Sequence, residues 1–310
     1  MSRLVSVIVP SYNHAAFIHA TLESIHAQSL PNLDVIVVDD GSTDNTALVL
    51  APWRERGVRV IHQDRRGPSA ARNRGIELAC GEFIAFLDAD DLWPRHDMLE
   101  AALAMFTAEP LTCWTFGDAQ PFEERDGQRL FIDAPYLQSG GYYKEASPGC
   151  QQRKITLGDL CNNDRFFIPM GTLVIRKRCF EEVGGFDAQL KMFEDTDMWM
   201  RLLRFPVAFF PSVLLWRRVH DKNLSHRRWA HLDDLRKLFE RYDLGAHGVS
   251  FDFHAARARY GAGREALRRG AFGAAAREFR ASLEHRAALK PTLLYAAARA
   301  AAVLYPDRKP

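Results

Sequence analysis

Short apolar runs, each followed by a segment with helical spacing, constrain the fold of this chain more than any other feature. The first run, Leu4 to Val9, is rich in β-branched residues, and the segment after it to about Gln28 carries apolar residues at helical intervals. Further runs follow at residues 34–38, 58–62 and 83–87. Strands that alternate with helices predict an α/β fold, with a mostly parallel sheet and helices on both of its faces.

Polar clusters close three of these four runs. The second run stops at Asp39–Ser42, and we expect a helix from Thr43 to about Arg56, capped by Ser42 or Thr43. The fourth run leads into Asp88–Asp91. Ligands collect at the carboxyl ends of parallel strands. The sequence therefore predicts a binding site where these clusters meet.

The bulk composition narrows the class of protein. A net charge of +2, with 47% hydrophobic and 26% charged residues, is ordinary for a globular protein and argues against nucleic acid as a partner. Five scattered cysteines without a CxxC pair predict reduced thiols. The start favours a strand over a signal peptide, and no run approaches the roughly 20 apolar residues of a membrane span. We expect a cytoplasmic protein.

The length of 310 residues favours two units. We place the main domain at residues 1–228, where an irregular stretch from Trp114 to Ile168 is expected to add some antiparallel strand. Residues 229–310 predict an α-helical extension rich in arginine and alanine, part of which is similar to one tetratricopeptide-like helical hairpin. The basic helices also predict peripheral contact with anionic lipid on the inner face of the plasma membrane.

The acidic cluster at Asp88–Asp91 sets three carboxylates within four residues. Charges this close repel one another, and each raises the pKa of its neighbours unless a cation neutralises them. A divalent ion is the simplest remedy, because Mg²⁺ or Mn²⁺ takes few protein carboxylates and keeps positions for water and a substrate phosphate. A solvated acidic turn before the next helix is the alternative.

Four ordered blocks resemble the family 2 glycosyltransferases, which are inverting enzymes with the GT-A fold. They cover roughly the first 225 residues and contain the stretches VSVIVPSYNHAAFIHATLESIHAQSL, VIVVDDGSTDNT, GPSAARNRGIELACGEFIAFLDADD and GTLVIRKRCFEEVGGFDAQLKMFEDTDMWMRL. The resemblance implies transfer of a sugar from a nucleoside diphosphate sugar, with UDP favoured, to a hydroxyl of a glycan or lipid-linked acceptor. Such reactions build cell-surface polysaccharide or lipopolysaccharide, and Mn²⁺ or Mg²⁺ is the implied cofactor.

The resemblance also implies which residues bind the donor. The first loop would hold the base together with Asp40, Arg72 would lie near the diphosphate, and Asp88 and Asp90 would form the Asp-x-Asp motif on the metal, joined by His220. The full donor set is Pro10, Tyr12, Asn13, Asp40, Arg72, Asn73, Asp88, Ala89 and Asp90. Alternatives remain open: Tyr12 as a core residue, Asp40 in an ordinary turn, Arg72 on an exposed helix face, and His220 as a surface or core residue.

The last block resembles the family signature Glu-Asp-x-Asp-x-Trp-x-Arg at residues 194–201. It implies Asp195 as the general base, with Glu194 beside it at the start of a helix, where the dipole favours acids. The acceptor side is implied to include Gly185, Phe186, Asp197 and Trp199. The glycines of residues 184–185 let the backbone approach a sugar, and a tight structural turn is their alternative.

Other classes of protein explain less of the sequence. A sugar nucleotidyltransferase usually carries a glycine-rich basic first loop, whereas this chain has Pro-Ser-Tyr-Asn-His. A hydrolase with two carboxylates needs no nucleotide-like loops. A catalytically silent binding scaffold for nucleotide sugars or carbohydrates has no need of both Asp90 and Asp195.

Overall fold

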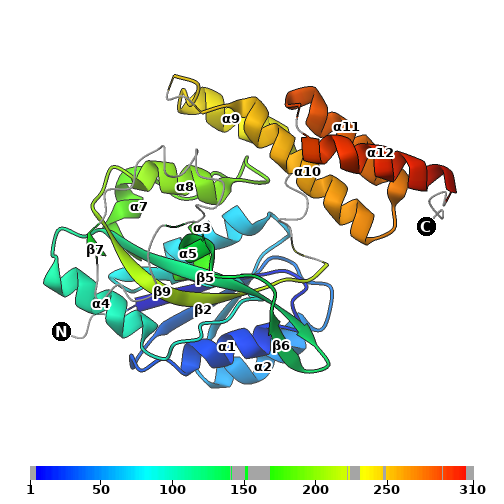
Figure 1. Ribbon diagram of the computed structural model, residues 1–310. Coiled ribbons are helices and arrows are strands. Elements are labelled where there is room, and N and C mark those ends of the chain that lie inside the picture. Colours follow the sequence, from blue (N-terminus) through cyan, green and yellow to red (C-terminus); the bar gives the residue numbers. More distant parts are fainter. Residues whose placement is uncertain are drawn as a thin grey trace. The chain divides into compact units, whose positions relative to one another are not determined.

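The computed structural model describes residues 5–139, 141, 151–152, 168–221, 223, 231–246, 249–287 and 289–304. It divides the chain into two compact units, Met1–Val219 and His220–Pro310 (Figure 1).

One mixed sheet forms the centre of the first unit. Its strands are β1 (Val5–Ser11), β2 (Asp34–Asp39), β3 (Arg59–His62), β4 (Phe83–Phe86), β5 (Trp114–Arg125), β6 (Gln128–Phe131), β7 (Gln151–Gln152), β8 (Val174–Arg176) and β9 (Val207–Arg218). The order across the sheet is β3-β2-β1-β4-β8-β5-β9-β7, with β6 paired to β5. The first four strands are parallel, and β8 runs antiparallel to both β4 and β5. The carboxyl ends of β2, β1 and β4 therefore lie next to one another.

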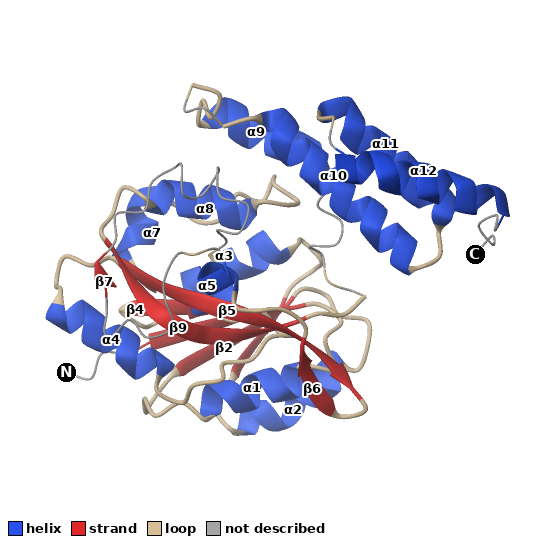
Figure 2. Cartoon of the chain, in the orientation of Figure 1, coloured by secondary structure: helices blue, strands red, loops and turns tan. Residues whose placement is uncertain are grey.

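Helices cover both faces of this sheet (Figure 2). They are α1 (Ile18–His26), α2 (Thr46–Glu55), α3 (Pro68–Leu78), α4 (Met98–Ala108), the short α5 (Tyr136–Ser139), a 3-10 turn η1 (Met170–Thr172), α7 (Arg178–Val183) and α8 (Glu194–Leu202). The predicted α/β class is confirmed. The antiparallel strand expected after Trp114 is present as β5 and β6, while most of residues 140–167 lie outside the described part.

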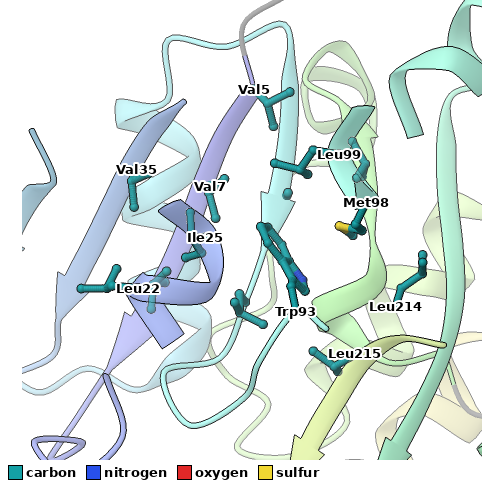
Figure 3. Packing of buried hydrophobic residues seen from close by; sticks show 14 of the residues in the cluster. Val5, Val7, Leu22, Ile25, Val35, Trp93, Met98, Leu99, Leu214 and Leu215 are labelled. Atoms are coloured by element: carbon teal, nitrogen blue, oxygen red, sulfur yellow. The ribbon is translucent and has the colours of Figure 1, made fainter. Parts of the chain in front are cut away.

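Two apolar cores form because side chains alternate across β1. Val7 and Val9 pack with Leu22 of α1 and Leu99 of α4 on one face, where Figure 3 shows Trp93 and Met98 in the same cluster. Ile8 packs on the other face with residues of α3, α7 and α8. Because β1 is buried on both faces, its sequence is a continuous apolar run rather than an alternating one.

The start of α2 differs from the prediction. The helix begins at Thr46, and Asp44 Oδ1 accepts hydrogen bonds from Thr46 N at 2.9 Å and from the Thr46 hydroxyl. Ser42 and Thr43 do not cap it, because both are hydrogen-bonded to Asn13 in the loop after β1. A contact between two loops thus overrides the local capping preference.

The second unit is helical in its described residues, as expected for the C-terminal extension. It contains α9 (Leu232–Arg241), α10 (Phe251–Arg268), α11 (Phe272–His285) and α12 (Leu289–Leu304). Phe279 and Ala275 of α11 pack with Ala298 of α12, and Gly263 lets α10 approach Phe279. The likeness to a tetratricopeptide hairpin stays a prediction. No described helix combines the length and the apolar character needed to cross a membrane.

Gly75 of α3 gives a test of this packing. A Cβ at this position would lie 2.3 Å from Ile8 Cγ2 in the core. We expect Gly75→Ala to lower the free energy of unfolding by about 1–3 kcal/mol, because overpacking forces α3 away from β1. Urea unfolding monitored by circular dichroism measures this loss.

The matched control is Gly261→Ala in α10, where a Cβ meets nothing within 4 Å. Its stability should be unchanged or raised by up to about 1 kcal/mol, because alanine favours helix. Equal stability of Gly75→Ala and wild type would contradict the close packing of α3 on β1.

Candidate active site

The loops after β1 and β2 are joined by Asn13. This residue adopts a left-handed conformation, with φ of 57°, which asparagine tolerates better than most residues. Its Oδ1 accepts the backbone N–H of Thr43 at 2.7 Å, and its own N–H donates to Ser42 Oγ at 2.9 Å. Pro10 is buried within β1 opposite Val38. Asn13 thus fixes the loop after β1 to the loop after β2, whereas Pro10 lies within the sheet.

Asp40 organises the loop after β3. Its carboxylate accepts hydrogen bonds from Gln63 Nε2 at 2.7 Å, from Arg66 N at 2.8 Å and from Gly67 N at 2.7 Å. The loop fixed in this way places the guanidinium of Arg65 over the ring of Tyr12, 4.3 Å from its centre. Tyr12 is half-buried at the surface, so it is not a core residue.

The acidic turn after β4 is held from behind by α1. The hydroxyl of Thr21 lies 2.9 Å from both Ala89 O and Asp91 O. Asp90 and Asp91 are buried, whereas the side chain of Asp88 is 38% exposed. Burial raises the pKa of Asp91 well above its ordinary value, and the neighbouring Asp90 and Asp88 raise it further. Asp91 therefore ionises less readily than an exposed aspartate.

Two basic residues that are distant from this turn in the sequence border it in the structure. His14 Nε2 lies 4.0 Å from Asp90 Oδ2. Arg218, at the end of β9, donates its backbone N–H to Asp91 Oδ1 at 2.8 Å and its Nε–H to Asp90 O at 2.9 Å, and its guanidinium pairs with Glu124. Arg218 is buried.

Arg72 connects the acidic turn to α8. Its Nη2 donates to Asp88 Oδ1 at 2.8 Å, and its Nη1 donates to Glu194 Oε1 at 2.9 Å. Burial lowers the pKa of Arg72, but Asp88 and Glu194 outweigh burial, so the net pKa is raised. Arg72 is buried, which excludes the alternative of an exposed helix position.

The acids at the start of α8 lie beside this guanidinium. Phe193, with φ of 66°, turns the chain into the helix. Glu194 is mostly buried, and burial together with Asp195 raises its pKa against the opposing effect of Arg72. Asp195 is half-buried, and its Oδ1 accepts the N–H of Thr196 at 2.7 Å. Glu194 therefore shares one guanidinium with Asp88, and Asp195 is the next residue of α8.

The residues predicted for the acceptor side form one packed group. Phe186 and Trp199 are buried in the core shared by α3, α7 and α8. Asp197 is fully buried and accepts hydrogen bonds from the guanidinium of Arg201. Asn73, predicted on the donor side, binds the backbone of Phe186 instead of projecting toward the acidic turn.

Sequence reasoning missed the contributions of His14, Arg65 and Thr21. Each acts on a residue far along the chain, and only the order of the strands brings the partners together. His220 begins the second unit, and its role as a metal ligand stays a prediction. Among the residues with assigned positions, no group of three or more His, Cys, Asp or Glu side chains is arranged to hold a metal ion.

Comparisons with known proteins identify the family of this chain. Residues 6–162 match Glycosyl transferase family 2, and residues 141–245 match Glycosyltransferase like family 2. The Bacillus subtilis protein "Putative teichuronic acid biosynthesis glycosyltransferase TuaG" is 39% identical over 234 residues, which are 73% of this chain and 83% of that protein.

Two solved structures share the fold. S. aureus TarS 1–349 in complex with UDP-GlcNAc has a TM-score of 0.57 at 18% identity, with 96% of this chain and 87% of that chain covered. The mannosyltransferase PcManGT from Pyrobaculum calidifontis, in complex with GDP-Man and Mn²⁺, has a TM-score of 0.54 at 20% identity, with 97% and 81% covered.

The sheet and these similarities define a glycosyltransferase with the GT-A fold. The residues matched by the family span about half of the chain, and the bacterial relative extends the match to most of it. The chain belongs to glycosyl transferase family 2, and the resemblance of its four blocks is confirmed.

Replacement of Arg72 tests its ion pairs with Asp88 and Glu194. In Arg72→Ala the buried carboxylate of Glu194 has no cation, so we expect a loss of about 3 kcal/mol or more in the free energy of unfolding. Asp88 contributes little to this loss, because solvent screens it. Arg72→Lys should recover part of the stability, because one ammonium keeps the charge but cannot fork across two carboxylates.

Arg74→Ala is the control on the same helix. Arg74 is exposed and pairs with Glu77, so its replacement should change stability by no more than about 0.5 kcal/mol. Urea unfolding of the three variants at neutral pH measures these values. A stability of Arg72→Ala equal to that of Arg74→Ala would refute the stabilising role of the buried Arg72–Glu194 ion pair.

Proposed function

We propose that this glycosyltransferase moves a sugar from a UDP-sugar to a hydroxyl of a glycan or lipid-linked acceptor, with inversion at the anomeric carbon. The observation that carries the proposal is the fork of Arg72 between Asp88 and Glu194. One buried guanidinium joins the acidic turn to the α8 acids, so a donor bound at the turn lies close to Asp195. The name of TuaG supports a role in the synthesis of a cell-surface polysaccharide.

The nucleotide is proposed to bind over the loops that follow β1, β2 and β3. The ring of Tyr12, which has the guanidinium of Arg65 over it, is proposed to stack with the base. A carboxylate has about four acceptor positions, and Asp40 accepts three protein hydrogen bonds, which leaves a position for an N–H of the base. TarS with bound UDP-GlcNAc, a protein of the same fold, supports UDP as the nucleotide.

The acidic turn fits a divalent metal ion. Its donors are carboxylate oxygens, which Mg²⁺ and Mn²⁺ prefer, and burial together with the neighbouring Asp90 and Asp88 raises the pKa of Asp91, which a bound cation would counteract. We propose that Asp90 and Asp88 hold Mn²⁺ or Mg²⁺, and the assignment of His220 as a further ligand stays a prediction. When bound, the ion offsets the negative charge that develops on the departing diphosphate. PcManGT, which binds Mn²⁺ and GDP-Man, supports this assignment.

Asp195 is proposed as the general base. It accepts the proton of the acceptor hydroxyl while that oxygen forms a bond to the anomeric carbon, and the bond from this carbon to the diphosphate oxygen breaks. The attack comes from the face opposite the diphosphate, so the configuration inverts. Arg72 holds the neighbouring Glu194 in an ion pair, and Asp195 is the residue that matches the aspartate of the family's Glu-Asp pair.

Asp195→Asn separates catalysis from binding. The amide cannot accept the proton, so we expect the rate of transfer to fall by about 10²–10⁴-fold, while Mn²⁺-dependent binding of UDP stays within about twofold of wild type. Calorimetry measures the binding, and release of UDP from the donor sugar measures the rate. Asp233→Asn is the matched control, because Asp233 is exposed and is also the second residue of its helix.

Asp90→Ala should weaken UDP binding in Mn²⁺ by at least about tenfold. Equal affinities of Asp90→Ala and wild type would refute the proposed metal site. Tight binding of UDP by a wild-type protein that releases no sugar from any of a panel of UDP, GDP and dTDP sugars would favour the catalytically silent scaffold.

We also propose that residues 1–228 form the catalytic domain and that the basic helices of residues 229–310 contact anionic lipid. Arg264, Arg277 and Arg299 are exposed on α10, α11 and α12. We expect the protein to sediment with phosphatidylglycerol vesicles at low salt and to be released at about 0.5 M salt, where charges are screened. Absence of co-sedimentation at low salt would remove this proposal.

A further inference from the structure

Asn73 makes a two-point contact with the backbone of Phe186. Its Nδ2 donates to Phe186 O at 2.8 Å, and its Oδ1 accepts the N–H of Phe186 at 2.7 Å. The side-chain amide thus binds both the backbone N–H and the backbone C=O of one residue. This is the pattern by which a residue of a neighbouring β-strand would hold it. Both polar groups of the amide are therefore engaged by the turn of residues 184–187.

The same contact restricts which residue can occupy position 185. Its φ lies outside the left-handed range, so its backbone conformation does not demand glycine. A Cβ at Gly185 would lie 2.4 Å from Asn73 Oδ1 and 2.9 Å from Asn73 Cγ. The glycine is thus required by the approach of Asn73.

Arg201 holds the turn from α8. Its Nη1 donates to Val183 O at 2.6 Å and to Gly185 O at 2.9 Å. Asp197, fully buried one helical turn earlier, pairs with the same guanidinium at 2.7 Å. The backbone of the turn is thus bound by α3 and by α8, the helix that carries Asp195.

The side chain of Phe186 anchors the turn in the core. Its ring lies edge-on to Phe86 of β4, with 5.5 Å between the ring centres. The guanidinium of Arg72 lies 5.4 Å from the same ring. Neighbouring residues of α3 therefore act on the two parts of the site: Arg72 on the acids, and Asn73 on the turn.

We propose that Asn73 is a positioning residue for the acceptor, which acts through the backbone of Phe186 and does not contact the nucleotide. The inference rests on the proposed function, because it takes the turn of residues 184–187 as part of the acceptor site. It assigns Asn73 a role different from the donor contact that the sequence resemblance implies. Loss of the amide releases the turn, so an acceptor hydroxyl is presented less accurately to Asp195.

Hydrogen–deuterium exchange tests the contact without any acceptor. In Asn73→Ala, the peptide containing Phe186 should exchange at least about tenfold faster than in wild type, because its amide has lost its partner. The affinity for UDP in Mn²⁺ should remain within about twofold of wild type. Arg74→Ala, on the exposed side of the same helix, should alter neither value. A tenfold loss of UDP affinity with unchanged exchange would overturn the proposal.

Kinetics tests the positioning role. The donor is the nucleotide sugar, from a panel of UDP, GDP and dTDP sugars, that wild type hydrolyses fastest, and p-nitrophenyl glycosides serve as acceptors. In Asn73→Ala we expect the ratio of transfer to hydrolysis to fall at least about tenfold, with hydrolysis within about threefold of wild type. General loss of structure would lower both rates together, and that result would count against positioning.

A double-mutant cycle identifies the steric contact. Gly185→Ala should lower the transfer-to-hydrolysis ratio at least about tenfold in wild type but less than about twofold in Asn73→Ala, where the opposing amide is gone. Equal effects in both backgrounds would refute the contact. If wild type binds no nucleotide, the proposed function fails, whereas the exchange experiment and the stabilities of the same variants still test the contact.

Discussion

The site depends on one buried cation placed between two groups of acids. Asp88 follows β4 and Glu194 begins α8, and both carboxylates are bound by Arg72. Without that charge, the acidic turn and the start of α8 would repel each other across a poorly solvated space. The ion pair of Arg72 and Glu194 needs the surrounding hydrogen bonds, because burial alone disfavours a lone charge. The arrangement of the acids is therefore a property of α3 as much as of β4 and α8.

The sheet explains why residues so distant in sequence meet. Parallel β2, β1 and β4 place three loops at one edge, and antiparallel β8 continues the sheet toward β5 and β9. The end of β9 returns Arg218 to the acidic turn. Thr21 on one face of the sheet and Arg72 on the other then fix the turn and its acids. The strand order thus determines which loops share the site.

Much of the fold could be predicted from local patterns, and the contacts that shape the site could not. The apolar runs of β1, β2 and β4 and the acids that follow them are visible in the sequence, because they depend on the burial of each segment itself. The predicted start of α2 at Thr43 was wrong, since Thr43 binds Asn13, thirty residues away. The approach of Gly185 to a sugar stays a prediction, and its close approach to Asn73 was not visible in the sequence. Such pairings depend on tertiary packing, which periodicity does not encode.

The three hydrogen bonds that Asp40 accepts from residues 63–67 have a consequence for ligand affinity. A segment that must become ordered on binding loses conformational entropy, and this loss reduces the affinity that the contacts provide. Here the carboxylate has already immobilised that segment, with Arg65 seated on Tyr12. A base bound beside this segment would meet a preorganised surface, so little of its interaction free energy would be lost to ordering the loop.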